Sequence, residues 1–247
     1  MPVPSPPRPR PVRRLLVGAG LAALGGCATG VATAPGDAPN PTTAPVSSTT
    51  ALVSPPATAP APAPAAPSGL VVSPGPGWGQ SGLEGPVPDT GACHSRSAAD
   101  GRPLPDPGCT PGAVDGSVTQ ADLGSTLCRP GGYTSSVRPP VSMTEPFKYS
   151  VMGAYGDGGS ASAYELDHLV PLELGGSSDT RNLWPEPDDH PSAGVANSKD
   201  PVENQLHDLV CAAASGGPYL PLATAQHLIA ADWTTALAKA QGAMVGR

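Results

Sequence analysis

Apolar residues recur at helical spacing in three segments of the second half of the chain. In the first segment, Phe147, Val151 and Tyr155 are four residues apart, which places them on one face of a helix. Thr144-Glu145-Pro146 is typical of a helix start, because proline fits the first turn, and Gly156 is typical of a helix end. The pattern predicts an amphipathic helix between these two points.

Two further helices are predicted near the C-terminus. Asp200-Pro201-Val202-Glu203 has the form of a capping box with proline at the first helical position, so a helix should begin there and end near Gly216. Its buried face would consist of Val202, Leu206, Leu209 and Val210. The last amphipathic helix is predicted from the spacing of six residues: Leu222, Leu228, Ile229, Trp233, Ala236 and Leu237.

Between the first two helices the pattern favours strands. Residues 164–170 form a short, largely apolar run, and Pro171 separates it from Leu172-Glu173-Leu174-Gly175-Gly176. These segments suit two short strands, or a strand and its return, with the glycines as a hairpin turn. The order helix, hairpin, helix, helix predicts a small α+β domain.

Composition divides the chain. Residues 1–88 contain 20 of the 35 prolines but, of the nine aromatic residues, only Trp78. Such a segment cannot bury enough apolar surface to offset the entropy lost on ordering. We therefore expect a disordered tether over residues 28–88, which has no Lys or Arg, and one folded domain over residues 89–247.

The first 27 residues have the composition of an export signal. Four arginines precede an apolar run over residues 15–24, which is followed by Gly25-Gly26-Cys27. Leu24-Gly25-Gly26-Cys27 resembles the bacterial lipobox, in which the cysteine is diacylated and becomes the mature N-terminus. This resemblance implies a membrane-anchored lipoprotein on the extracytoplasmic face, with Cys27 as the lipidation site. The alternative is an ordinary signal peptide with an incidental cysteine.

Four cysteines remain in the domain. An even number in an exported domain favours two disulfides, for which three pairings exist. We favour Cys93–Cys109, closing an entry loop rich in Gly and Pro, and Cys128–Cys211, tying that entry to a later helix. A zinc site is the alternative, but no two of these cysteines have C-x-x-C spacing.

Two neighbouring residues, Asp167 and His168, have side chains suited to hydrolytic chemistry. A carboxylate is a good ligand for magnesium or calcium, and a neutral imidazole can take a proton from water near pH 7. Adjacent side chains on a strand point to opposite faces, so the two share one site only where the strand bends or ends. Pro171, which lacks an N–H, favours such an interruption.

The run Leu166-Asp167-His168-Leu169-Val170-Pro171-Leu172-Glu173-Leu174-Gly175-Gly176, followed by Arg181-Asn182-Leu183-Trp184, resembles the HNH nuclease signature. That signature has an acidic residue and His, a Pro-Leu pair, Gly-Gly, and Asn-Leu before a helix. Residues 93–240 are similar to a group of exported bacterial proteins called HNH-family endonucleases. The similarity continues through Cys128, Val137-Arg138-Pro139-Pro140, Asn182-Leu183-Trp184-Pro185-Glu186-Pro187, Lys199-Asp200 and Val210-Cys211.

The resemblance implies a ββα-metal core with flanking helices, and a role for each matching residue. His168 would be the general base, Asp167 would bind a single metal ion, and Asn182 would hold the loop and orient the histidine. The ion would be divalent, with magnesium as our first choice and zinc, calcium or manganese as alternatives. Arg138 and Arg181 could contact phosphate or be ordinary surface charges.

The third element of the signature, an Asn or His near the start of the last helix, departs from the family pattern. The family's Asn or His stands three residues before a lysine, but counting back from Lys199 gives Ala196, which cannot bind metal. Asn197 is one residue away. Glu203 and His207 share a helical face at i, i+4 and offer another solution. Asn197, Glu203 and His207 are therefore alternative metal ligands, and a surface contact between the last two is the competing interpretation.

Residues 89–247 contain nine Lys and Arg against eighteen Asp and Glu, which gives a formal charge of −9. This charge excludes the basic surface of a high-affinity DNA binder. The leading hypothesis is a monomeric, metal-dependent HNH-like endonuclease with nucleic acid as substrate and the membrane as its anchor. The alternative is a catalytically silent envelope or surface-binding lipoprotein on the same scaffold.

Overall fold

The structure, a computed structural model, describes residues 69–189 and 197–246. Within them the chain is a mixture of helices and short strands, as the predicted α+β class requires. The helices are α1 (Thr134–Val137), α2 (Val141–Tyr155), α3 (Asp200–Cys211), α4 (Leu222–Asp232) and α5 (Ala236–Ala243). Five short 3-10 segments join them: η1 (Gln120–Asp122), η2 (Ala161–Ala163), η3 (Leu172–Leu174), η4 (Thr180–Asn182) and η5 (Ala212–Ser215).

The described strands form two-stranded sheets. Three are antiparallel: β2 (Trp78–Gly79) with β3 (Gly82–Leu83), β4 (Arg96–Ser97) with β5 (Pro103–Leu104), and β7 (Tyr164–His168) with β8 (Leu183–Pro187). The fourth pairs β1 (Val71–Ser73) in parallel with β6 (Ala113–Asp115). The longest pairing is β7 with β8, in which Asp167 lies opposite Trp184 and His168 opposite Leu183.

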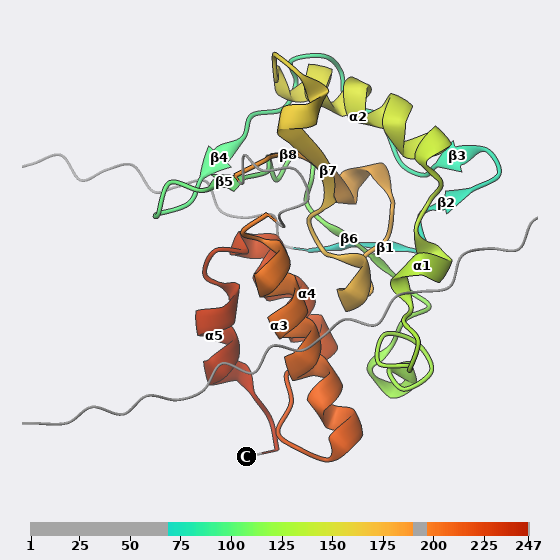
Figure 1. The fold of residues 1–247 in the computed structure, drawn as a ribbon, viewed down its shortest axis with the longest axis vertical. Coiled ribbons are helices and arrows are strands. Elements are labelled where there is room, and N and C mark those ends of the chain that lie inside the picture. The colour runs from blue at the N-terminus through green and yellow to red at the C-terminus, as the bar shows by residue number, and fades with distance from the viewer. Residues whose placement is uncertain (1–68, 190–196, 247) are drawn as a thin grey trace, which may run out of the picture. The chain divides into compact units, whose positions relative to one another are not determined.

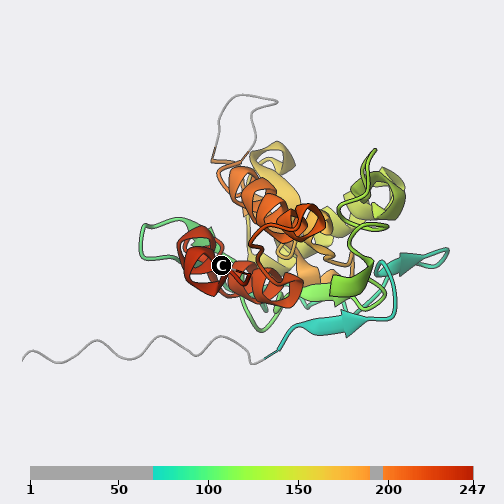
Figure 2. The same cartoon turned by 90° about the horizontal axis from the view of Figure 1, so that it is seen from below.

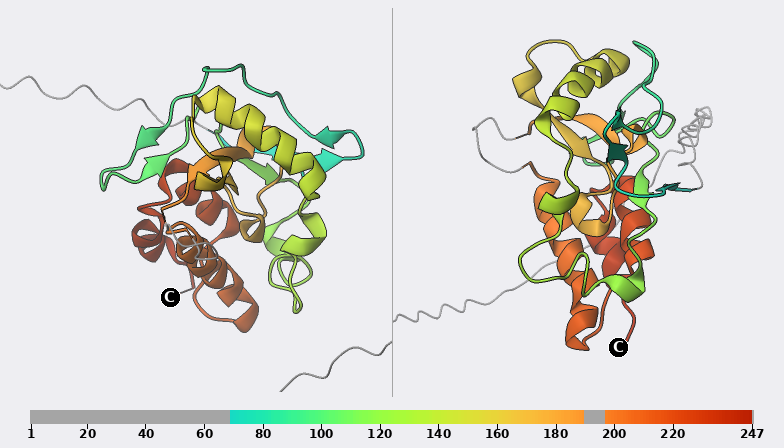
Figure 3. Two further views of the ribbon diagram at one scale, coloured as in Figure 1. Left: turned by 45° about the horizontal axis from the view of Figure 1, so that its top comes forward. Right: turned by 90° about the vertical axis from the view of Figure 1, so that its right-hand side faces the viewer.

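The β7–β8 hairpin lies between α2 on one side and helices α3, α4 and α5 on the other (Figures 1 and 3). One apolar cluster joins the hairpin to α2, and a second contains the buried faces of α3, α4 and α5. The chain continues extended beyond β7, so consecutive side chains alternate in direction. Leu169 accordingly packs into the cluster with Phe147 and Val151 of α2, whereas Val170 packs into the cluster with Leu206 of α3. The packing of Leu169 and Val170 into opposite clusters fixes the end of β7, where Asp167 and His168 lie.

Helix α2 buries the predicted face, Phe147, Val151 and Tyr155, and ends at Gly156, whose φ of 71° is left-handed. Its start was predicted three residues too late. The helix begins at Val141, directly after Pro140, and Pro146 lies inside it. A proline there removes one backbone hydrogen bond, and the packing of the apolar face compensates for that loss.

Helix α3 starts where predicted and buries Val202, Leu206 and Val210, with Leu209 packed against the same cluster. The predicted capping box is wrong, because no side chain caps this helix and Glu203 is bonded to Lys199 instead.

The single C-terminal helix was also predicted incorrectly, because α4 ends at Asp232 and α5 begins at Ala236. Oδ1 of Asp232 accepts hydrogen bonds from the backbone N and the hydroxyl of Thr234 at 3.0 and 2.6 Å. This local side-chain bonding competes with continuation of the helix.

The return strand of the hairpin lies later in the chain than the sequence predicted. Leu172–Leu174 forms the 3-10 segment η3, and the strand that pairs with β7 is β8. Gly175 is left-handed with a φ of 73°, and a Cβ at Gly176 would lie 1.8 Å from the carbonyl oxygen of Val170. The two glycines therefore make a close backbone turn, although not a two-residue hairpin.

The predicted boundary at residue 89 is wrong as well. Residues 69–88 contain β1, β2 and β3, and β1 pairs with β6 (Figure 2, cyan). Leu70 packs against the larger apolar cluster, and Trp78 donates its indole N–H to the carbonyl oxygen of Val137. The export signal, Cys27 and tether residues 28–68 lie outside the described residues.

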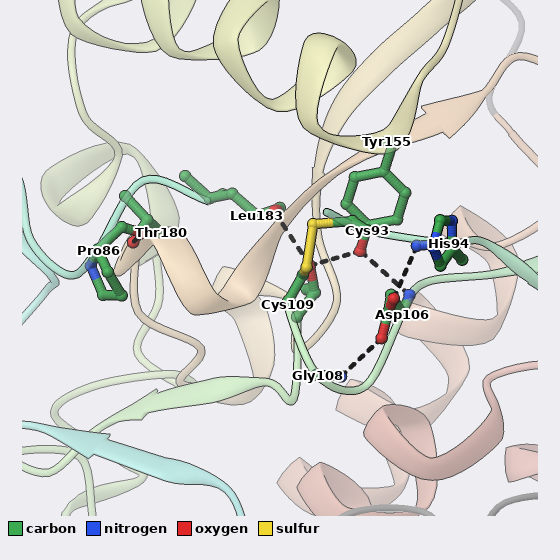
Figure 4. Close-up of a disulfide and its surroundings, with 10 residues drawn as sticks. Pro86, Cys93, His94, Asp106, Gly108, Cys109, Tyr155, Thr180 and Leu183 are labelled. Carbon is green, nitrogen blue, oxygen red and sulfur yellow. Dashed lines mark hydrogen bonds between the residues drawn. A yellow bond between two sulfur atoms is a disulfide. The ribbon is translucent and has the colours of Figure 1, made fainter. Parts of the chain in front are cut away.

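Both favoured disulfides, Cys93–Cys109 and Cys128–Cys211, are present. Around the first (Figure 4), Asp106 accepts backbone hydrogen bonds from His94 and Gly108, and the Tyr155 hydroxyl is bonded to the backbone N of Asp106. Among the described helices, none combines the length and apolar composition needed to span a bilayer.

Candidate functional site

The end of β7 and the first turn of α3 border a cavity of about 90 Å³. Asp167 and His168 both line it, which is feasible because the strand ends at His168. The other lining residues come from four segments of the chain: Arg138, Glu165, Leu166, Pro171, Leu172, Asp200 and Glu203.

Lys199 lies beneath these groups and is completely buried. Its ammonium donates to Oδ2 of Asp167 at 2.8 Å, to the carbonyl oxygen of His168 at 2.9 Å, and to Oε1 of Glu203. Burial acts to lower the pKa of Lys199, but the charges of Asp167, Glu203 and Glu186 outweigh it and raise that pKa above its ordinary value. The lysine is therefore a permanent internal cation.

More carboxyl groups surround this ammonium than it can neutralise. Glu165 and Asp167 lie on the same face of β7, and Glu165 is directly opposite Glu186 of β8. Burial, followed by the charge of Asp167, raises the pKa of both Glu165 and Glu186. Burial also raises the pKa of Glu203, against the opposing effect of Lys199. This face therefore has more carboxyl groups than Lys199 can neutralise, which favours the binding of protons or of a second cation.

His168 is held in its neutral form. Its Nε2 is 2.9 Å from the Ser178 hydroxyl. Burial lowers the pKa of His168 to about 3, and the charges of Arg138 and Lys199 add to that effect. With Nε2 bonded to Ser178, Nδ1 has no hydrogen-bond partner among the described residues. The free ring nitrogen next to the cavity has a lone pair for a proton, and the lowered pKa makes it a weak base.

Asn182 uses all of its side-chain hydrogen-bonding capacity on the backbone. Its Oδ1 accepts from the N–H groups of Ala113 and Val170 at 3.1 and 2.9 Å, and its Nδ2 donates to the carbonyls of Val170 and Ser177 at 2.9 and 2.8 Å. The side chain is completely buried and holds the segments on either side of η3 together. Asn182 therefore fixes the loop that carries Ser178, and through Ser178 the position of His168.

Residues 69–88 cover this loop from the other side. Ser178 donates its backbone N–H to Pro76 at 2.6 Å, and Thr180 donates to Glu84 at 2.7 Å. A Cβ at Gly77 would lie 2.2 Å from the backbone N of Asp179, so only glycine permits this approach. Residues 69–88 thus help to bury the loop whose Ser178 binds His168.

The three alternative metal ligands have separate positions in the structure. Glu203 lines the cavity with Asp167. Asn197 lines a different cavity, of about 340 Å³, and donates to Glu165 at 3.4 Å. His207 is one turn further along α3, with Nε2 3.1 Å from the carbonyl oxygen of Leu127 and 3.4 Å from Cys211 Sγ. The structure therefore brings Glu203 to Asp167, but neither Asn197 nor His207 lines their cavity.

The two candidate arginines also differ. Nε and Nη2 of Arg181 donate to the two carboxylate oxygens of Asp179, at 2.8 and 2.7 Å. Arg138 lines the cavity and has no ion-pair partner among the described residues. Arg138 alone is available to an anion at this site.

Sequence reasoning missed the roles of Lys199, Glu186 and Ser178. A lysine one turn before Glu203 on a predicted helix favours an i, i+4 ion pair, and this spacing is the signal that identifies Lys199. Glu186 could have been placed opposite Glu165 only with the correct return strand. The sequence around Ser178 does not predict its contact with His168, because any hydroxyl in that loop could reach the histidine.

The donor set suits a hard divalent cation. Asp167 and Glu203 each use one carboxylate oxygen on Lys199, and the second oxygen of each has no hydrogen-bond partner among the described residues. Both residues line the cavity together with Asp200. Carboxylate oxygens are the ligands that magnesium and calcium prefer. Among the described residues, this cavity offers no three ligand atoms within 4.8 Å of one another, so Asp167 and Glu203 fit a magnesium ion only as a pair of ligands, with water completing its shell.

Comparison with known proteins adds nothing to this geometry. No family model matches the chain, and no curated protein or solved structure is significantly similar to it.

Proposed function

We propose that the protein is an exported, metal-dependent endonuclease that hydrolyses phosphodiester bonds of nucleic acids at the Asp167–His168 cavity. The observation that carries the proposal is that Asp167, Glu203, the neutral His168 and Arg138 line one cavity, and that Arg138 has no ion pair among the described residues. The order β7, a loop held by Asn182, β8 and α3 is the order that an HNH-like ββα-metal core requires.

Each side chain has a task in this proposal. Asp167 and Glu203 would hold one divalent ion, magnesium before zinc, calcium or manganese, and a bound ion supplies Lewis acidity toward phosphate and leaving oxygens. Nδ1 of His168 takes a proton from the attacking water, while Ser178 fixes the ring through Nε2. Arg138 binds a phosphate oxygen. Asn182 keeps the loop in place and touches no substrate.

The test is a nuclease assay on the full chain carrying Cys27→Ser. It should cut plasmid DNA, single-stranded DNA or RNA with a divalent ion, and chelator should stop it. His168→Ala should lower the rate by about 10²–10⁴, the usual effect of losing a positioned general base. His227→Ala, a change on the exposed side of α4, is the matched control and should leave the rate unchanged.

The metal ligands can be separated by their metal requirement. Asp167→Ala and Glu203→Gln should both raise the concentration of metal needed for half-maximal activity. Asn197→Ala and His207→Ala should not, because neither side chain lines the cavity. A folded wild-type chain that binds no divalent ion and cuts no nucleic acid would contradict the proposal.

Lys199 favours a second candidate function, a catalytically silent envelope or surface-binding protein. Its ammonium already joins Asp167 to Glu203, as a bound cation would. A scaffold that no longer uses metal would have this arrangement. Isothermal titration with Mg²⁺, Mn²⁺ and Ca²⁺ distinguishes the two, since only the nuclease should bind an ion and lose that binding in Asp167→Ala.

The cellular location is a proposal from the sequence alone. We propose that Cys27 carries a diacyl anchor, that the mature chain is attached to the extracytoplasmic membrane face, and that the domain works as a monomer. Cys27→Ser should release the protein from membranes or leave its precursor uncleaved. Intact-mass analysis showing cleavage at another site, with no lipid on Cys27, would refute the anchor.

A further inference from the structure

A second group of potential ligands lies at the C-terminal end of α3, away from the cavity. His207 and Cys211 are one helical turn apart on α3, and the disulfide joins Cys211 to Cys128. One potential ligand atom from each of Cys128, His207 and Cys211 lies within 4.8 Å of the other two. All three residues are half-buried, so reagents in solution can reach them.

The oxidation state of the sulfurs decides what this cluster can bind. In the disulfide the two sulfurs are bonded to each other and offer no thiolate. After reduction the cluster offers two thiolates and one imidazole, a soft donor set typical of zinc sites.

The spacing suits tetrahedral coordination. Ligand atoms around a tetrahedral zinc ion are roughly 3.5 Å apart, given the usual Zn–S and Zn–N lengths. His207 Nε2 is already 3.4 Å from Cys211 Sγ, and the Cα atoms of Cys128 and Cys211 are 5.5 Å apart. Side-chain rotation can therefore separate the sulfurs without moving the helix, at the expense of the bond between His207 and the Leu127 carbonyl.

The other disulfide provides a comparison within the same chain. Cys93, whose disulfide is drawn in Figure 4, is completely buried, and among the described residues no third His, Asp or Glu completes a cluster with Cys93 and Cys109. Reduction there yields two sulfurs and no imidazole ligand.

We propose that the reduced chain binds one zinc ion through Cys128, His207 and Cys211, with water in the fourth position. The disulfide and the metal then exclude each other at the same two sulfurs. An external dithiol supplies two electrons and two protons to the disulfide and is itself oxidised to a disulfide, and zinc binding releases the two thiol protons. This site does not depend on the proposed nuclease activity, which uses oxygen ligands.

The experiment is a Co²⁺ titration, because thiolate ligation gives cobalt a charge-transfer absorption band. The full chain carrying Cys27→Ser, Cys93→Ser and Cys109→Ser retains only the disulfide in question. After reduction it should develop the band at one equivalent of Co²⁺, and one equivalent of Zn²⁺ should remove it. The oxidised protein should show no band.

Matched variants identify the ligands. His207→Ala in the same background should weaken Co²⁺ binding at least tenfold, and His227→Ala should leave it unchanged. Cys128→Ser with Cys211→Ser, in a chain that keeps Cys93 and Cys109, should abolish the band. Absence of a band in the reduced parent, or a band insensitive to His207→Ala, would overturn the proposal.

Far-UV circular dichroism covers the case in which reduction unfolds the chain. Zinc should then restore the helical signal in the reduced parent but not in His207→Ala. A reduced parent that stays unfolded with zinc present counts against the site.

Discussion

At the scale of single residues, Lys199 determines the electrostatics of the site. A fully buried lysine is costly unless it is paired, and this one has three oxygen partners from three residues. It links β7 to α3 by binding the side chain of Asp167 and the backbone of His168 at the same time. The position of the histidine therefore depends on the lysine as well as on Ser178.

Replacing Lys199 with Met should lower the free energy of unfolding by about 3–5 kcal/mol, because it leaves Asp167 and Glu203 buried without their cation. Chemical denaturation at pH 7 with chelator present measures the loss. Lys239→Met, on the exposed side of α5, is the control and should change stability by less than about 0.5 kcal/mol. Adding Glu203→Gln to Lys199→Met should recover part of the loss, and an equal loss in the double variant would contradict the argument.

His168 should make the protein sensitive to acid. Its pKa falls from 6.5 to about 3 on folding, mainly through burial, so between these values the unfolded chain binds the proton and the folded chain does not. Stability is then lost as the pH falls below 6.5, by about 1.4 kcal/mol for each pH unit. Lowering the pH from 6.5 to 5 should cost about 2 kcal/mol through this group.

The matched variant for this acid sensitivity is His168→Gln, whose amide can still bond to Ser178 but does not titrate. Its stability should fall less than that of the wild type between pH 6.5 and 5, as measured by denaturant midpoints. His227→Gln should behave like the wild type. Parallel pH profiles for wild type and His168→Gln would show that the folded histidine titrates normally.

At the scale of elements, one face of the β7–β8 hairpin collects acidic side chains. Glu165, Asp167 and Glu186 lie on that face together with Trp184, which pairs with Asp167 and donates its indole N–H to Oδ2 of that residue. Like charges directly opposite on neighbouring strands destabilise a sheet, so the Glu165–Glu186 pair is a cost that the fold tolerates. Such conflicts between local stability and arrangement concentrate at functional sites.

Glu186→Gln should stabilise the protein, and increasingly so at higher pH. Burial and Asp167 raise the pKa of the folded Glu186 carboxyl above 4.5, so stability is lost as the pH rises from 4.5 toward the folded value. Glutamine resembles the protonated form and escapes this loss. We expect a gain of about 1–3 kcal/mol at pH 8 and little at pH 4.5 in metal-free buffer, with exposed Glu145→Gln as the control. A gain independent of pH would contradict the assignment.

The helices were more predictable from the sequence than the hairpin. Spacing four apart identified the buried faces of α2 and α3, because a helix that buries one side must repeat near 3.6 residues. The return strand was not predictable, because Leu172–Leu174 has the apolar character of a strand and becomes a 3-10 turn through Gly175 and Gly176. Asp167 and His168 could be named from the sequence, but their surroundings depend on contacts between distant segments.

At the scale of the whole domain, ordered structure begins before the point that composition indicates. Residues 69–88 have the proline and glycine content of a linker, yet they form one strand of the β1–β6 pair and bind the loop over residues 177–180. Ser73 joins this contact, because its hydroxyl is 3.0 Å from that of Ser177. The segment therefore contributes to the folded domain and supports His168 indirectly.

Comparing two truncated chains tests this role. The chain 69–247 should unfold with the same thermal midpoint as the chain lacking only residues 1–27. The chain 89–247 should unfold at a lower temperature, because the backbone groups of Ser178 and Thr180 lose their partners and Trp78 no longer donates to Val137. Each unmade buried hydrogen bond costs about 1–3 kcal/mol, so a decrease of more than 5 °C is expected.

A point variant separates loss of this contact from loss of chain length. Gly77→Ala in the chain 69–247 keeps every residue but places a Cβ against the backbone of Asp179, and should lower the midpoint in the same direction. Gly79→Ala is the matched control, because a Cβ there has no neighbouring atom within 4 Å. If the chain 89–247 and the Gly77→Ala variant both unfold at the same temperature as the chain 69–247, residues 69–88 have no part in holding the loop over residues 177–180. If both unfold at a lower temperature than the chain 69–247, residues 69–88 stabilise the loop that holds His168. The ring proton of His168, observed by NMR, should then exchange faster in the chain 89–247 than in the chain 69–247.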